Sequence, residues 1–196
     1  MARSGGPQRL VGVLSLQGAF AAHQRALEAV GASTRQVRKP GDLDGIDALV
    51  MPGGESTTMS RLLATSGLFD HVKGLIGDGM PVFGTCAGMI LLASEVLDGR
   101  DDQLSFGALD ATVQRNGYGR QIDSFEADLE VAGFDKPFHA VFIRAPKVVA
   151  VGANVDVLAE YDGVPVVARQ GHVMVASFHP ELTADARLHA RFLQEV

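Results

Sequence analysis

The sequence contains no tryptophan and one cysteine, Cys86, among its 196 residues. A single cysteine cannot form an internal disulfide bond, so the composition favours a reducing compartment, and we expect the cytoplasm. No apolar run approaches the length of a membrane-spanning helix, so no membrane association is expected. Residues 1–8 lack the apolar core of a signal peptide and are predicted to form a disordered tail.

Basic residues are also scarce, with 17 Lys and Arg against 23 Asp and Glu and a net charge of −6. They form no cluster, which argues against nucleic-acid binding. No group of His, Cys and carboxylate residues has the spacing of metal ligands, so we expect neither a metal nor another cofactor. The length is typical of one domain, which we assign to residues 9–196.

Short apolar runs followed by glycine are abundant in the first half of the chain. Their alternation with amphipathic runs predicts a parallel sheet covered by helices on both faces. Strands are expected over residues 10–16, 33–37, 47–51 and 81–84, a polar turn with helical potential over 40–45, and helices over 19–30, 57–65, 68–76 and 88–96. The predicted fold class is α/β with a doubly wound, mostly parallel central sheet.

After Gly99 the pattern changes to short strands separated by turn residues. The pair Asp162-Gly163 is typical of a two-residue hairpin turn, so an antiparallel region is added to the sheet. Strands are expected over residues 106–113, 125–130, 137–143, 148–151, 155–161, 164–169 and 173–178, with a final helix over 184–196.

The string Gly84-Thr85-Cys86-Ala87-Gly88 joins an expected strand to an expected helix. Small residues around a strand-to-helix corner are typical of a nucleophile elbow, here with cysteine in place of serine. A helix N-terminus and a nearby histidine both favour the thiolate, which is the nucleophile, and the Ala87 N–H is a candidate oxyanion donor. The alternative is a buried structural cysteine, the commoner state of a free thiol.

A nucleophile needs a base, and His179 is the best candidate among six histidines. It ends an apolar strand, and Pro180 restricts it to extended conformations. Glu181 follows two residues later and is placed to orient the imidazole, so we predict a Cys86, His179, Glu181 triad. The alternative for this string is an ordinary turn. His23, His71 and His189 lie in helical patterns, where surface positions are expected.

The glycine-rich segment from Pro52 to Ser56 ends another expected strand. Ligands of doubly wound sheets bind at the carboxyl ends of the strands, so this segment, the elbow and His179 are expected to meet. The Gly54 N–H would then be a second oxyanion donor. The segment could equally cap the next helix through Ser56 or Thr57, and both roles are compatible.

Taken together, these elements resemble class I glutamine amidotransferases, whose triad is Cys, His and Glu. Further strings narrow the resemblance to one branch, the glutaminase subunits of pyridoxal 5′-phosphate synthase. The resemblance covers Leu10 to the final helix and rests on Leu16-Gln17-Gly18, Pro52–Thr58, Gly84–Gly88, Gly119-Arg120-Gln121, Ser124-Phe125-Glu126, Phe142–Pro146 and Ser177–Thr183. It departs mildly from the branch at Gly117 and Tyr118.

The resemblance implies a flavodoxin-like fold and hydrolysis of L-glutamine to glutamate and ammonia through a γ-glutamyl thioester on Cys86. It also implies that ammonia passes to a (β/α)₈-barrel synthase subunit within a large hetero-oligomeric complex. The positions that match the family's glutamine-binding residues are Gly54, Glu55, Ser56, Arg115, Ile143 and Arg144. Two alternatives remain open: a glutaminase that serves histidine or purine synthesis, and a non-catalytic or redox-sensing α/β protein.

Overall fold

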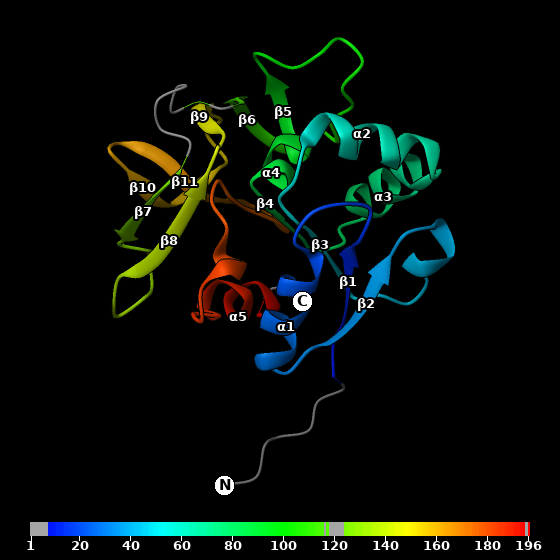
Figure 1. The fold of residues 1–196 in the computed structure, drawn as a ribbon, viewed down its shortest axis with the longest axis horizontal. Coiled ribbons are helices and arrows are strands. Elements are labelled where there is room, and N and C mark those ends of the chain that lie inside the picture. The colour runs from blue at the N-terminus through cyan, green and yellow to red at the C-terminus, as the bar shows by residue number, and fades with distance from the viewer. Residues whose placement is uncertain (1–7, 116, 118–123, 195) are drawn as a thin grey trace, which may run out of the picture.

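The computed structural model describes residues 8–115, 117, 124–194 and 196, and Figure 1 shows their arrangement. All but the last residue of the predicted tail, and the string Gly119-Arg120-Gln121 with Tyr118, lie outside the described residues. The α/β class is confirmed, because a large central sheet lies between two groups of helices.

The central sheet has seven strands in the order β10-β11-β12-β4-β3-β1-β2. The five strands from β12 to β2 are parallel, and their order matches that of flavodoxin-like folds. The strands are β1 (Leu10–Leu14), β2 (Ser33–Val37), β3 (Ala48–Met51), β4 (Val82–Thr85), β10 (Asp156–Tyr161), β11 (Val164–Gln170) and β12 (Val173–Ala176). All of β3, β4 and β12 is buried, as expected for strands covered on both faces.

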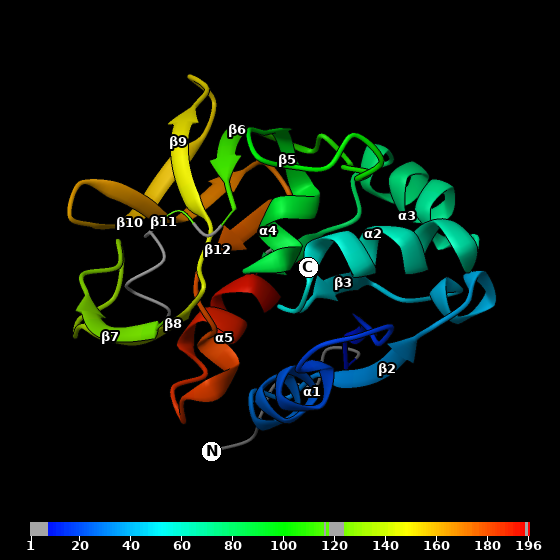
Figure 2. The same cartoon turned by 45° about the horizontal axis from the view of Figure 1, so that its top comes forward.

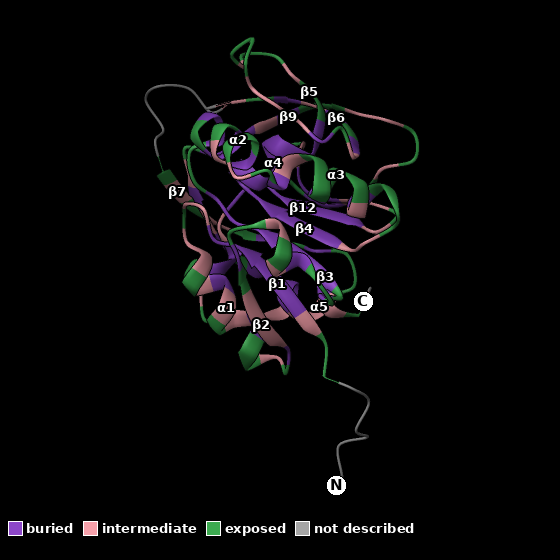
Figure 3. Cartoon of the chain, turned by 90° about the vertical axis from the view of Figure 1, so that its right-hand side faces the viewer, coloured by how far each residue is buried: buried purple, intermediate pink, exposed green. Residues whose placement is uncertain are grey.

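Helices cover both faces of this sheet, as the alternation predicts (Figure 2). One apolar core lies beneath α2 (Ser56–Thr65), α3 (Leu68–Gly77) and α4 (Ala87–Leu92). The other lies beneath α1 (Phe20–Ala29) and α5 (Arg187–Leu193). Figure 3 shows the consequence, with buried strands between helices whose outer sides are exposed. Two short 3₁₀ turns, Pro40–Leu43 and Pro180–Leu182, complete the helical elements.

The expected antiparallel region is present. Strands β10 and β11 extend the central sheet, and the turn between them has positive φ at both Asp162 and Gly163, as a two-residue hairpin requires. The remaining strands form two small sheets, one of β5 (Ala93–Val96), β6 (Leu109–Gln114) and β9 (Lys147–Val151), the other of β7 (Ser124–Leu129) and β8 (Phe138–Ile143).

Several strand ends differ from the prediction by one to three residues, and two helices differ by three or more residues at an end. The helix expected over residues 88–96 ends at Leu92, because the carbonyls of Leu91 and Leu92 accept hydrogen bonds from Phe106 and Ala108, and the chain continues as β5 beside β6. The helix expected over residues 184–196 is shorter and spans Arg187–Leu193. Tertiary strand pairing, which apolar spacing does not reveal, decides the first of these.

Candidate active site

Cys86 sits at the corner between β4 and α4, as the small residues around it predict. Its φ of 48° lies in a region that non-glycine residues rarely occupy. Its N–H donates to the Ala176 carbonyl at 2.8 Å, which ties the corner to the end of β12. Gly88 lets α4 pass close to β3, because a Cβ there would lie 2.2 Å from the Met51 carbonyl oxygen.

Backbone strain of this kind recurs at one other residue near Cys86. Among the described residues other than glycine, positive φ is found at Cys86, Arg144 and Asp162. Asp162 belongs to the hairpin turn, whereas Cys86 and Arg144 line the same cavity. Strained backbone that is not part of a turn tends to cluster at functional sites, so both positions point to this cavity.

His179 lies shortly after the end of β12, and both its backbone and its ring are fixed by hydrogen bonds. Its N–H donates to the Val141 carbonyl at 2.9 Å, and its Nδ1 lies 2.8 Å from Oε1 of Glu181. Gly53 lies against the front of the ring, since a Cβ there would be 2.4 Å from Cε1 of His179 and 3.3 Å from Cβ of Cys86. The three strand-end segments expected to converge therefore do so.

Cys86, His179 and Glu181 influence one another's protonation. Burial is the largest influence on His179 and would lower its pKa, but hydrogen bonding to Cys86 and Glu181, with their charges, raises the pKa to about 10. Burial would raise the pKa of Glu181, yet the hydrogen bond with His179 and nearby positive charge lower it overall. A protonated imidazole between a carboxylate and a sulfur is the charge state that stabilises a cysteine thiolate.

The cavity in front of Cys86 has a volume of about 310 Å³. Its lining includes all six predicted glutamine-binding residues, Gly54, Glu55, Ser56, Arg115, Ile143 and Arg144, together with Cys86 and His179. Glu181 lies behind His179, and Ala87 is buried as the first residue of α4, where a backbone N–H has no partner within the helix. The Sγ of Cys86 is 4.0 Å from the Ile143 carbonyl oxygen.

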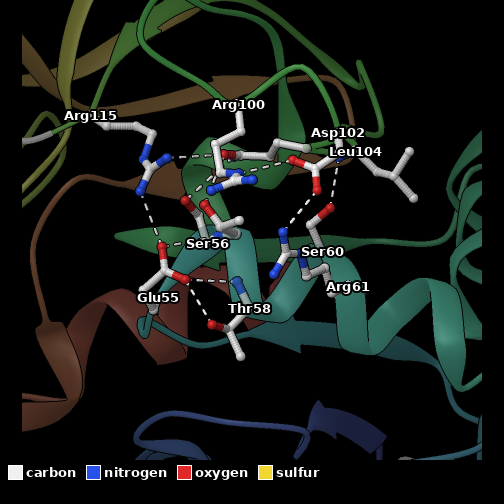
Figure 4. Close-up of polar contacts among 11 residues, drawn as sticks. Glu55, Ser56, Thr58, Ser60, Arg61, Arg100, Asp102, Leu104 and Arg115 are labelled. Carbon is white, nitrogen blue, oxygen red and sulfur yellow. Dashed lines mark hydrogen bonds and ion pairs between the residues drawn. The ribbon is translucent and has the colours of Figure 1, made fainter.

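Glu55 and Arg115 form an ion pair on the wall of this cavity, with 3.1 Å between Oε1 and Nη2 (Figure 4). Glu55 also caps α2, where its carboxylate accepts the N–H groups of Thr57 and Thr58, so the cap is Glu55 rather than Ser56 or Thr57. Burial would raise the pKa of Glu55, but these hydrogen bonds lower it. Gln103, which sequence analysis missed, accepts from Nη1 of Arg115 at 3.3 Å.

The surface positions predicted for two further histidines are wrong. His23 in α1 and His189 in α5 are fully buried rather than at the surface, and both lie behind Glu181. His71 is exposed, as expected. A signal for burial was present, because His23 lies four residues before the buried Leu27, on the stripe of α1 that faces the core.

Among the residues that the structure describes, no group of three or more His, Cys, Asp or Glu residues is arranged to hold a metal ion. No described helix has the length and apolar character needed to cross a membrane.

Comparison with known proteins gives consistent matches over nearly the whole chain. The model of the SNO glutamine amidotransferase family matches residues 13–196. A protein of Thermosipho africanus named "Pyridoxal 5'-phosphate synthase subunit PdxT" is 55% identical over 95% of this chain and 98% of its own. A protein of the same name from Corynebacterium jeikeium is 54% identical over 95% of this chain and 96% of its own.

Solved structures agree with these sequence matches. A crystal structure described as a glutamine amidotransferase superimposes with a TM-score of 0.90 and 49% identity, and the match covers 94% of this chain and 97% of the other.

Proposed function

The chain belongs to the SNO glutamine amidotransferase family, and from this premise we propose that it is the glutaminase subunit of a pyridoxal 5′-phosphate synthase. It hydrolyses L-glutamine to L-glutamate and ammonia. The observation that carries the residue assignment is the meeting of the strained Cys86 with the His179–Glu181 pair at one cavity. The assignment treats residues 9–196 as one glutaminase domain.

In the first step, the Cys86 thiolate attacks the side-chain carbonyl of glutamine. A carbon–sulfur bond forms and the carbonyl oxygen becomes an oxyanion, which the N–H groups of Gly54 and Ala87 stabilise. The carbon–nitrogen bond then breaks, and His179 gives its proton to the departing ammonia. The product is a γ-glutamyl thioester on Cys86 and a neutral imidazole.

In the second step, the neutral His179 takes a proton from a water molecule, which attacks the thioester. The carbon–sulfur bond breaks, and glutamate leaves with the second water proton on its new γ-carboxyl group, which then releases this proton to solvent. The thiolate and imidazolium are restored. Glu181 holds the imidazole in one tautomer through its 2.8 Å contact with Nδ1 and stabilises the positive charge. The raised pKa of His179, about 10, means that its proton is present before the reaction begins.

Glutamine is a zwitterion at its α-carbon, and the cavity wall offers charges of both signs. The guanidinium groups of Arg115 and Arg144 suit the α-carboxylate. The Glu55 carboxylate suits the α-ammonium, and the backbone at Gly54, Ser56 and Ile143 supplies further polar contacts. The existing Glu55–Arg115 ion pair places two opposite charges side by side on this wall.

The ammonia passes to a synthase subunit, a (β/α)₈ barrel, in a hetero-oligomeric complex, because ammonia released to water would be lost. The relatives are named as subunits of pyridoxal 5′-phosphate synthase, which supports a pairing with another subunit of that enzyme. Their 54–55% identity argues against a glutaminase for histidine or purine synthesis and against a non-catalytic redox sensor. A single cysteine fits action in the cytoplasm.

The test is to mix the chain with a pyridoxal 5′-phosphate synthase barrel subunit and to measure both glutamate release and pyridoxal 5′-phosphate formation. The wild-type chain should support both from glutamine. Cys86→Ala should abolish both with glutamine, while added ammonium salts still support pyridoxal 5′-phosphate formation. Glutamine-dependent synthesis by Cys86→Ala would refute the assignment of the nucleophile, and no stimulation of glutamate release by the barrel subunit would refute the pairing.

A further inference from the structure

Glu181 is buried between two histidines, of which the proposed mechanism uses only one. Its Oε1 lies 2.8 Å from Nδ1 of His179, and its Oε2 lies 3.3 Å from Nε2 of His23. The side chains of Glu181 and His23 are both 0% exposed. Among the described residues, Oε2 has no contact that meets the full geometry of a hydrogen bond, so His23 is the polar group that faces it.

His23 is itself held by its neighbours. Its Nδ1 lies 2.9 Å from Nε2 of His189, a fully buried residue of α5, and its Nε2 also lies 3.1 Å from the Thr85 hydroxyl. Thr85 is the residue before Cys86, so this cluster joins α1 and α5 to the elbow. A continuous line of short contacts therefore runs from His189 through His23 and Glu181 to His179.

The arrangement fixes the tautomers of both buried rings. Nδ1 of His189 is buried and has no hydrogen-bond partner within the described part of the chain. A bare ring nitrogen is tolerated there more readily than an unpaired N–H, so the proton of His189 lies on Nε2 and is donated to His23. Nδ1 of His23 is then the acceptor, and its own proton lies on Nε2, pointing at Glu181 and Thr85.

We propose that His23, held in this tautomer by His189, is a positioning residue for Glu181. Its Nε2–H faces the carboxylate oxygen that His179 does not use, which keeps Glu181 ionised and turned toward His179. The inference rests on the proposed roles of Cys86, His179 and Glu181, which it extends to the buried side of the triad.

The electrostatics agree with a neutral donor rather than a second cation. Burial lowers the pKa of His23 to about 4. The negative charge of Glu181 opposes this shift, whereas the positive charge of His179 adds to it. Burial and the neighbouring His23 lower the pKa of His189 to about 3, although Glu181 opposes this. Both rings are therefore neutral near pH 7, so the charge on Glu181 is directed to His179 and is not shared with an adjacent imidazolium.

The test compares two substitutions at His23 in the complex with the synthase barrel subunit. His23→Leu keeps apolar volume but removes the N–H, whereas His23→Gln keeps an N–H at about the same distance from the backbone. We expect His23→Leu to lower kcat for glutamate release roughly 10- to 100-fold, with KM for glutamine changed less than about twofold, because the N–H that faces the buried Glu181 carboxylate is replaced by an apolar group. His23→Gln should recover most of kcat.

His71→Leu is the matched control, because His71 is exposed on α3 and, among the described residues, its ring hydrogen-bonds to the Gly67 carbonyl alone. It should leave kcat and KM unchanged. Wild-type kcat in His23→Leu would overturn the proposal. Equal loss of kcat in His23→Leu and His23→Gln would also overturn it, since that is the result of a purely structural role.

A second measurement does not depend on the folding of a variant. Nitrogen-15 NMR of the wild-type chain should show His23 protonated on Nε2 and bare on Nδ1, and the opposite tautomer would overturn the proposal. Glu181→Gln separates this inference from the proposed function. If His23→Leu is fully active while Glu181→Gln is inactive, only the positioning role fails, whereas full activity in Glu181→Gln means that the triad itself is wrong.

Discussion

The two sides of the proposed Cys86, His179, Glu181 triad are built in different ways. On the cavity side, Cys86, Glu55 and Arg115 come from strand-end loops, and the Glu55–Arg115 ion pair is partly exposed, with side chains 45% and 21% accessible. On the buried side, the side chains of Glu181 and His23 are 0% exposed, and His23 belongs to α1. The cavity side can therefore rearrange at little cost, whereas the side behind His179 is fixed by burial.

The largest expected loss of activity comes from Glu181, which contacts His179 toward the cavity and His23 on the buried side. Glu181→Gln keeps the shape of the side chain but removes the charge facing His179, so the imidazolium loses its stabilising partner. We expect kcat for glutamate release to fall about 10³- to 10⁴-fold, as for the equivalent change in other triads, while glutamine still binds. Steady-state kinetics of the complex would check this, and a loss confined to KM would contradict the role given to Glu181.

The next largest effect is expected from the close contact between Gly53 and the His179 ring. In Gly53→Ala the added methyl group would lie 2.4 Å from Cε1 of His179, so the ring must move. A displacement of this size should lower kcat about 100-fold. Gly74→Ala is the matched control, because a Cβ at Gly74 meets nothing within 4 Å, and it should leave kcat unchanged. Normal kcat in Gly53→Ala would mean that the loop does not constrain His179.

A substitution on the cavity side, Arg115→Ala, should weaken glutamine binding rather than slow the chemical step. Arg115→Ala removes one of the charges offered to the α-carboxylate and leaves Glu55 without its partner on the wall. We expect KM for glutamine to rise roughly 10-fold or more while kcat changes little. This split is the reverse of that expected for His23→Leu. A fall in kcat at unchanged KM would remove the distinction between the two sides.

The buried side should also be visible in the pH dependence of stability. Near pH 6.5 an unfolded histidine takes up a proton, but His23 and His189 resist protonation until about pH 4 and 3. The unfolded state therefore binds more protons over this window, and the free energy of unfolding falls as pH falls from 6.5 to 4. Urea unfolding should show a smaller acid-induced loss in His23→Leu than in wild type.

Glu181 and His179 are the charged groups that influence the pKa of His23, and neither is substituted in His23→Leu. His71→Leu should follow the wild-type curve, since its ring is exposed. Parallel acid-induced losses in wild type and His23→Leu would show that His23 is protonated as readily in the folded chain as in the unfolded one.

The difference between the cavity side and the buried side also explains which site residues could be predicted from the sequence. Strand ends and the residues that follow them have strong local signals, so Cys86, His179 and the segment from Pro52 to Ser56 were all expected at one edge, and the structure brings them together. The buried histidines have a much weaker signal, which is only the position of His23 four residues before Leu27 in α1. A histidine in an amphipathic helix resembles a surface residue, and only the packing of α1 and α5 against the sheet buries His23 and His189.

The end of α4 at Leu92 was missed for a similar reason, because the pairing of β5 with β6, which are separated in sequence, ends that helix. Gln103 likewise reaches Arg115 only through the fold. The predicted roles of Gly54 and Ala87 in binding the oxyanion stay predictions.

The most direct test of the central claim is to identify the residue that carries the glutamyl group. The complex with the synthase barrel subunit would be mixed with glutamine, quenched in acid within its first turnovers and digested for mass spectrometry. The account predicts a γ-glutamyl group on the peptide that contains Cys86, and no such adduct in Cys86→Ala. Glutamate release at the wild-type rate with the adduct on any other residue would contradict it.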